Sequence, residues 1–301
     1  MKIALTGGTG FVGSHLLDAA LAAGHRVAAL TRRGQPERDG GDWVMGDLGT
    51  REALEQLVDG ADAIIHVAGT ISAANAAGFE KGNAAGTLAM LAAATAGGVR
   101  RFVHVSSLAA REPKLSLYGG SKARAEELVH SSGLDWAIVR PPAVYGPGDK
   151  ETLELFRMAK LGLMLMPPKG RVSVIHADDL ARLLLALAAP DVASNILIEA
   201  DDGKPGGWSH REFARALAAA VGTRPAIVSS PGMLLRLAAR VDQLWRGEKA
   251  KLTADRAAYF SHRNWVVEPK RACPPQLWQP RIETLQGLAD TAAWYREQGW
   301  L

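Results

Sequence analysis

Short apolar runs alternate with amphipathic stretches of helical period along the first half of the chain. Apolar runs of strand length that are bounded by glycine are typical of buried strands. Strands are expected at Lys2–Thr6, Arg26–Thr31, Trp43–Met45, Ala63–Val67, Arg101–Val105 and Trp136–Val139, and helices at Phe11–Ala23, Thr50–Val58, Phe79–Ala96 and Ser121–His130. This alternation favours right-handed crossovers and a parallel sheet covered on both faces. We therefore predict an α/β protein with a Rossmann-type doubly wound parallel sheet.

The rhythm changes after Val144, where prolines interrupt the pattern. Further elements are expected as helices at Leu153–Leu165, Leu180–Leu187, Phe213–Val221, Leu234–Trp245 and Ile282–Gln298, and as strand character at Arg171–Ile175. Ser209 and Glu212 form a capping box ahead of one of these helices. We expect a dinucleotide-binding domain over residues 1–144, with 172–199 folding back onto it. Residues 145–171 and 200–301 would form a smaller, mostly helical substrate domain.

Composition narrows the class of protein. The 301 residues are 48% hydrophobic and 22% charged, which argues against a disordered, collagen-like or coiled-coil chain. The net charge is +4 and the basic residues are scattered, so no nucleic-acid partner is expected. The single cysteine, Cys273, cannot form an intrachain disulfide, and no metal site is expected. No apolar run has the roughly 18 residues of a membrane span, and no signal peptide is recognised, so we expect a cytoplasmic protein.

A glycine-rich loop follows the first expected strand and opens the first expected helix. It carries Gly7, Gly10 and Gly13 at the spacing G-x-x-G-x-x-G. Glycines let the backbone approach a pyrophosphate closely, and the helix N-terminus attracts the anion. The context therefore favours dinucleotide binding over a ligand-free turn.

The end of the second strand indicates which dinucleotide is bound. An acidic residue there usually binds the adenosine ribose hydroxyls. This chain has Arg32 and Arg33 instead, and guanidinium groups bind a 2′-phosphate. The pair favours NADP over NAD, and two solvated arginines are the alternative. Asp47, after the third strand, is a candidate for the adenine amino group or for a simple turn.

Candidate chemistry lies after the fifth strand. Tyr118 and Lys122 are four residues apart in the following helical segment, so they share one face. Ser106 and Ser107 stand at the carboxyl end of the strand, where ligands bind in open α/β sheets. A tyrosine has an ordinary pKa near 10, and a nearby ammonium is expected to lower it. This set suits proton transfer to or from an oxygen during hydride transfer.

Taken together, these motifs resemble the extended short-chain dehydrogenase/reductases, the NAD-dependent epimerase/dehydratase family. The matching segments fall in the family's order at Thr6–Gly13, Asp47–Leu48, His66–Gly69, Asn83–Thr87, Arg101–Ser107, Tyr118–Lys122, Arg140–Pro147, Ile175–Asp179 and Thr291–Tyr295. The likeness thus extends over nearly the whole chain. In pattern it is similar to the dihydroflavonol reductase and 3β-hydroxysteroid dehydrogenase side of the family.

The resemblance implies a role for each matching residue. Tyr118 would be the acid/base, Lys122 would bind the nicotinamide ribose, Ser107 would hold the substrate oxygen and Asn83 would support the lysine. The implied cofactor-binding residues are Gly7, Gly10, Phe11, Val12, Gly13, Arg32, Arg33, Asp47, Leu48, Val67, Ala68, Gly69, Tyr118, Lys122, Pro141, Ala143 and Val144. The resemblance leaves a homodimer open.

Three functions fit the sequence. The first is an NADP-dependent oxidoreductase that interconverts a ketone and a secondary alcohol on an apolar small molecule. The second is a nucleotide-sugar epimerase or dehydratase, and the third is a non-catalytic NADP-binding regulatory subunit. The alanine-rich loop 70–78 lacks the polar groups that a nucleotide-sugar pocket needs, which favours the first.

Apolar residues expected to line the substrate pocket are Leu153, Leu155, Phe156, Met158, Leu161, Leu163, Met164, Leu165 and Met166, with Leu234, Leu235, Leu237, Leu244 and Trp245 as a second wall. Burial of these side chains in the core of the smaller domain is the alternative.

Overall fold

The computed structural model describes residues 1–229 and 254–301. The chain divides into two compact units. The first contains residues 1–141, 178–199 and 271–278, and the second contains 142–177, 200–270 and 279–301. Residues 172–177 thus group with the second unit, and 271–278 with the first. The expected helix Leu234–Trp245 and its apolar wall lie outside the described residues.

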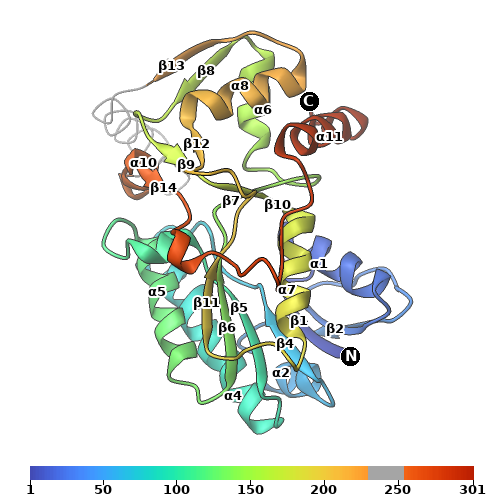
Figure 1. Ribbon diagram of the computed structural model, residues 1–301. Helices are drawn as coiled ribbons and strands as arrows, with labels where there is room; N and C mark the ends of the chain where they lie inside the picture. The colour runs from blue at the N-terminus through green and yellow to red at the C-terminus, as the bar shows by residue number, and fades with distance from the viewer. Residues whose placement is uncertain (230–253) are drawn as a thin grey trace. The chain divides into compact units, whose positions relative to one another are not determined.

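A parallel sheet of seven strands forms the centre of the first unit (Figure 1). The strands are β1 (Lys2–Thr6), β2 (Arg26–Thr31), β3 (Gly41–Met45), β4 (Ala63–His66), β5 (Arg101–Val105), β6 (Asp135–Arg140) and β11 (Ile196–Glu199). Their spatial order is β3-β2-β1-β4-β5-β6-β11, and every adjacent pair is parallel. The strands are added toward one edge from β1 to β3 and toward the other edge from β4 onward, so the strand order reverses between β1 and β4, as in doubly wound folds that bind dinucleotides. This confirms the predicted Rossmann-type fold, and β11 folds back onto β6.

Helices cover both faces of this sheet. They are α1 (Phe11–Ala22), α2 (Arg51–Val58), α3 (Ala76–Phe79), α4 (Gly86–Ala96), α5 (Leu117–His130) and α7 (Ala177–Ala188), with a short 3-10 helix η2 (Leu108–Arg111). Side chains of α2, α4 and α5 pack with the strands in one apolar core, which includes Leu57, Met90 and Val129. His15 of α1 and Asp178 of α7 are joined by a 2.5 Å contact. The first contacts attach α2, α4 and α5 to the sheet, and the second joins α1 to α7.

The expected helix Phe79–Ala96 is wrong as one continuous α-helix. Residues Glu80–Ala85 form a π-helix, η1, between α3 and α4. Gly82 lies against Thr70 so closely that a Cβ there would collide with the threonine hydroxyl. π-Turns inside α-helices often occur at functional sites. Here the turn directs Asn83 inward, where its side chain is 2% exposed.

The second unit is built from helices and short strands. Its helices are α6 (Leu153–Lys160), α8 (His210–Val221), α10 (Ala254–Ser261) and α11 (Thr284–Glu297), with a 3-10 turn η4 (Pro269–Arg271) at its border. Its strands are β7 (Ala143–Tyr145), β8 (Leu163–Met166), β9 (Arg171–Val172), β10 (Val174–His176), β12 (Trp208–Ser209), β13 (Ala226–Ser229) and β14 (Asn264–Trp265). The predicted capping box is present, because the Ser209 and Glu212 side chains each bond the other's backbone N–H.

The expected helix Leu153–Leu165 is also wrong over its last turn. Gly162 has a φ of +83°, a left-handed conformation that ends the helix and starts β8. Leu163 and Leu165 then point to solvent, while Met164 and Met166 join the core. Leu153 and Phe156 are buried in that core, and Leu155 and Met158 pack against it. Six of the nine residues of the first expected wall therefore lie in this core or pack against it, the alternative that the sequence left open, and Leu161, Leu163 and Leu165 are exposed.

Among the described residues, no helix combines the length and apolar character that crossing a membrane requires.

Candidate active site

The tyrosine, lysine and serine of the sequence motif meet at the carboxyl end of β5. Helix α5 begins at Leu117, earlier than the expected Ser121, because the Ser116 hydroxyl accepts the N–H of Gly119 at 3.0 Å and caps it. Tyr118 thereby lies in the first turn and Lys122 one turn later. Ser107 caps the short helix η2 through the N–H of Ala109 at 3.2 Å. Local capping thus fixes both the strand end and the helix start.

Tyr118 is half-buried, and its phenol is a hydrogen-bond partner of the Ser107 hydroxyl. Burial raises the pKa of Tyr118 above its ordinary value, and the hydrogen bond from Ser107 acts in the opposite direction. The lowering that the sequence analysis expects from Lys122 is therefore wrong for the protein alone. A raised pKa leaves the phenol protonated at neutral pH, so Tyr118 can donate a proton to an oxygen placed beside it.

Lys122 is buried, with 4% of its surface exposed. Its ammonium Nζ donates a hydrogen bond to the backbone oxygen of Val105 at 2.9 Å. Burial lowers the pKa of Lys122 to about 8, although the Glu126 carboxylate raises it. Gly69 lies close by, because a Cβ on it would be 3.0 Å from Nζ and 2.9 Å from Asn83 Oδ1. The lysine head thus packs against the loop that follows β4.

Asn83 makes three hydrogen bonds in the interior. Its Oδ1 accepts the N–H of Thr70 at 2.7 Å, and its Nδ2 donates to the Thr70 carbonyl at 3.0 Å and to Ser121 Oγ at 2.8 Å. Asn83 therefore fixes the loop after β4 and the residue that precedes Lys122. None of these three hydrogen bonds goes to Lys122 itself. The sequence did not point to Thr70 or Ser121, because Thr70 follows a motif and Ser121 is an unspecified position within one.

The glycine loop is tightly folded between β1 and α1. Gly7 has a φ of +78°, and a Cβ on Gly13 would collide with the Gly7 carbonyl oxygen. Gly10 precedes α1 and offers no side chain to cap it. The first N–H groups of α1 are therefore open to a ligand, and the helix dipole favours an anion there. Phe11 and Val12 form the half-buried start of the helix.

Arg32 and Arg33 are exposed directly after β2. The backbone of Arg33 is held by Thr31, whose hydroxyl donates to the Arg33 carbonyl at 2.7 Å. Asp47 accepts the N–H of Gly49 at 2.8 Å and the Thr50 hydroxyl at 3.3 Å, so its carboxylate shapes a turn ahead of α2. Leu48 packs closely against Gly86 of α4.

The remaining predicted cofactor residues fall into two places. Val67, Ala68 and Gly69 follow β4, and the N–H of Ala68 donates to the Thr6 hydroxyl at 3.2 Å. Pro141 ends the first unit, and its carbonyl accepts the N–H of Leu108 at 3.0 Å. Ala143 and Val144 lie on β7 of the second unit. Val67, Ala68, Gly69 and Pro141 therefore lie in the same unit as Ser107, Tyr118, Lys122 and Asn83, whereas Ala143 and Val144 belong to the second unit.

Two buried histidines lie beside this site. His66 of β4 and His104 of β5 are register partners, and their rings stack with centroids 5.5 Å apart. His66 is hydrogen-bonded to Thr6 at 2.7 Å and to Thr87 at 3.2 Å, whereas neither nitrogen of His104 has a hydrogen-bond partner within the described chain. Burial, followed by the charge of Lys122, lowers the pKa of His66 to about 3 and that of His104 well below its usual value. Both rings are thus held neutral.

We expect these histidines to make the fold sensitive to acid. Their pKa in the fold is depressed below the unfolded value of about 6.5, so the stability they contribute is present above pH 6.5 and is lost as the pH falls. Each histidine lowers the free energy of unfolding by up to about 1.4 kcal/mol for every pH unit below 6.5. His104→Leu, which leaves no polar partner unsatisfied, should match the parent at pH 7.5 and unfold with a weaker pH dependence between pH 6.5 and 5. Denaturant unfolding at several pH values measures this. The exposed His130, replaced by Gln, serves as the control, and an unchanged pH slope in His104→Leu would contradict the expectation.

Comparison with known proteins identifies the family. The profile of the NAD dependent epimerase/dehydratase family matches residues 3–197, which is more than half of the chain. The chain belongs to this family. A ceramide reductase from Caulobacter vibrioides is 37% identical over 99% of this chain and 96% of its own length. A 4-hydroxy-2-methyl-3-oxo-4-farnesyl-3,4-dihydroquinoline-1-oxide ketoreductase from Stigmatella aurantiaca is 30% identical over 96% of this chain and 95% of its own.

Solved structures agree with this assignment at the level of the fold. The Bordetella bronchiseptica enzyme WbmG in complex with NAD has a TM-score of 0.77 to this chain at 18% identity. The match covers 100% of this chain and 95% of that one. At this identity the likeness shows that the two chains share one fold.

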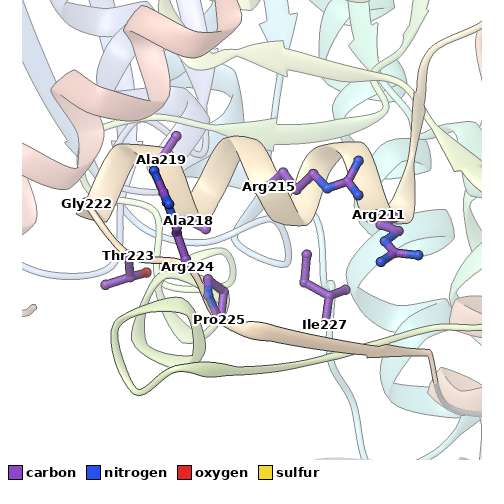
Figure 2. A pocket seen from close by; sticks show the side chains of 9 residues that line it. All are labelled: Arg211, Arg215, Ala218, Ala219, Gly222, Thr223, Arg224, Pro225 and Ile227. Atoms are coloured by element: carbon purple, nitrogen blue, oxygen red, sulfur yellow. The ribbon is translucent and has the colours of Figure 1, made fainter.

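A cavity of about 540 Å³ lies on the second unit, and none of its lining residues belongs to the family motifs of the sequence. Figure 2 shows the side chains that line it. It lies between α8 and β13 and is lined by Arg211, Arg215, Arg224 and Ile227 among others. The lining contains guanidinium groups and small apolar side chains but no group that transfers protons near neutral pH. The candidate catalytic residues of this epimerase/dehydratase family member are therefore those at the end of β5.

Proposed function

We propose that the chain is an NADP-dependent reductase that converts a ketone on a largely apolar, lipid-like molecule into a secondary alcohol. The observation that carries the proposal is the hydrogen-bonded pair of Ser107 and Tyr118 hydroxyls, with the buried Lys122 one helical turn away. The reductase names of the two relatives support an NAD(P)-dependent oxidoreductase within the family.

The arrangement supports a division of labour among these side chains. The Ser107 hydroxyl would hold the ketone oxygen, and the protonated Tyr118 would donate its proton to that oxygen as negative charge develops. Lys122 would place its ammonium group at the nicotinamide ribose. NADPH supplies the hydride that adds to the carbonyl carbon, so one ketone and one proton give one alcohol and NADP⁺.

The residues around the glycine loop fit the proposed cofactor. The uncapped start of α1 and the exposed Gly10 before it suit a pyrophosphate. Arg32 and Arg33 are exposed where a 2′-phosphate would lie, and their guanidinium groups have no hydrogen bond or ion pair among residues 1–229 and 254–301. Two free cations and no carboxylate at this position favour NADP over NAD.

The substrate class is inferred from the relatives and from this chain's own loop. Their names describe a lipid and a farnesyl-bearing 3-oxo compound. In this chain the loop after β4 is rich in alanine, and the part of it between Thr70 and Gly78 offers few groups that could hold a sugar. An apolar ketone with a long hydrocarbon group therefore fits better than a nucleotide sugar.

The test is steady-state turnover with NADPH on two panels of compounds. Long-chain 3-oxo amides and prenylated ketones should be reduced with net loss of NADPH absorbance, and kcat/KM should exceed that for UDP-sugars by at least about 10²-fold. The nucleotide-sugar epimerase or dehydratase reading predicts the reverse, with the sugar converted and no net NADPH consumed. A clear preference for UDP-sugars would overturn the proposal, and binding of NADPH without any turnover would favour a regulatory subunit.

A further inference from the structure

A buried network of charged side chains lies directly beneath the candidate catalytic residues. Glu126 follows Lys122 by one turn of α5 and Tyr118 by two turns, so the three share one face of the helix. Its carboxylate is 4% exposed. It accepts a hydrogen bond from the Ser106 hydroxyl at 2.5 Å and two from Arg140, at 2.8 Å from Nε and 2.6 Å from Nη2.

The network continues to the edge of the sheet. Arg140 at the end of β6 lies 3.6 Å from Glu199 at the end of β11, and Glu199 lies 3.4 Å from Arg111 of η2. The ends of β5, β6 and β11 are thereby tied to α5 and η2. A buried ion pair of this kind contributes little net stability compared with apolar packing, because both charges lose their hydration. Net stabilisation of the fold therefore does not explain why these charged groups are buried next to Lys122.

We propose that Glu126 is a positioning residue: its charge keeps the buried Lys122 ammonium protonated, and its hydrogen bond to Ser106 fixes the strand end that carries Ser107. The part played in catalysis rests on the proposed function. The effect on Lys122 is a property of the chain itself, and it can be measured without a substrate.

The surroundings of Lys122 leave this task to Glu126. The side chain is in contact with the Val105 carbonyl and lies beside Asn83 and Gly69, none of which carries a charge. His66 and His104 lie near enough for the charge of Lys122 to lower their pKa, and both are neutral at working pH.

The remaining ionisable groups do not replace it. Tyr118 on the same helix face is protonated, because its pKa is raised. Arg140 is a cation, which cannot favour a second positive charge on Lys122, and it donates to both oxygens of the Glu126 carboxylate. Burial alone would lower the pKa of Lys122 further than the value of about 8 that it has with Glu126 in place.

The experiment is a ¹³C NMR titration of the lysine Cε signals, with Lys122 assigned by its loss in Lys122→Met. In Glu126→Gln the pKa of Lys122 should fall by about one unit or more. Glu127→Gln, which alters the adjacent exposed residue, should leave that pKa unchanged. As the pH rises, NADPH binding should weaken when Lys122 loses its proton. This weakening should begin at a lower pH in Glu126→Gln than in the parent, and at the parent's pH in the control. A parent-like pKa of Lys122 in Glu126→Gln would overturn the inference.

Two further variants keep the result decisive. If the buried charge left on Arg140 prevents folding, Glu126→Gln combined with Arg140→Gln replaces both partners by neutral hydrogen-bonding groups. The pKa of Lys122 should again lie below that of the parent, and a parent-like value contradicts the proposal.

Ser106→Ala keeps the Glu126 carboxylate, so the pKa of Lys122 should stay as in the parent. The kcat should fall while the KM for NADPH stays the same. A fully active Ser106→Ala enzyme would remove the strand-end role. Because the titration needs no substrate, a failed search for reductase activity leaves the result on Lys122 intact.

Discussion

Replacing Tyr118 with phenylalanine should lower the kcat of the proposed reduction by roughly 10²–10⁴-fold, the usual contribution of a general acid. The change removes one hydroxyl and keeps the ring, which packs 6.2 Å from the ring of Phe79. The fold and the binding of NADPH should therefore be nearly unaffected. Stopped-flow turnover with a ketone substrate and fluorescence titration of NADPH separate the two effects.

A matched control removes a tyrosine hydroxyl elsewhere in the chain. Tyr259 lies on α10 of the second unit, where its ring stacks on Trp265. Tyr259→Phe should keep both turnover and cofactor affinity. If Tyr118→Phe retains full activity, the proton comes from another group, and the assignment of Tyr118 as the acid is wrong.

The strands of the first unit were predictable because parallel strands are buried on both faces. Lys2–Thr6 and Arg101–Val105 are short segments with mainly apolar centres, and both appear with the expected bounds. The expected helix Phe79–Ala96 is interrupted by the π-helix η1, where Gly82 passes close to the Thr70 side chain, a contact that no local pattern encodes. Sequence periodicity specifies the buried face of an element but not the places where a neighbour displaces its backbone.

The candidate site shows the same limit. The spacing of Tyr118 and Lys122 was readable because both lie on one helix, and Ser107 because it ends a strand. Glu126 extends the same spacing by one more turn and could have been found from it. Its partner Arg140 comes from another strand, and only the fold brings it to the carboxylate. The stacking of His66 on His104 likewise depends on the register of β4 and β5.

Cofactor choice should depend on Arg32 and Arg33, with an effect nearly as large as that of Tyr118. The parent should bind NADPH more tightly than NADH, because each guanidinium contact to a 2′-phosphate is worth about 1–2 kcal/mol at an exposed site. Arg32→Asp combined with Arg33→Ala should therefore weaken NADPH binding by roughly 10–10³-fold and leave NADH binding equal or stronger. Calorimetric titration of both cofactors measures the two affinities.

The control for this charge change is Arg51→Ala, an exposed arginine of α2 that is paired with Glu55 at 2.7 Å. It lowers the net charge without touching the end of β2, so the ratio of the two affinities should stay as in the parent. Added salt should weaken the binding of NADPH more than that of NADH in the parent, and this excess should disappear in the double variant, since screening acts on the exposed contacts to the phosphate. Equal affinities of the parent for NADPH and NADH would mean that the two arginines face solvent in the complex, and the preference for NADP would then be wrong even if the reductase chemistry at Tyr118 holds.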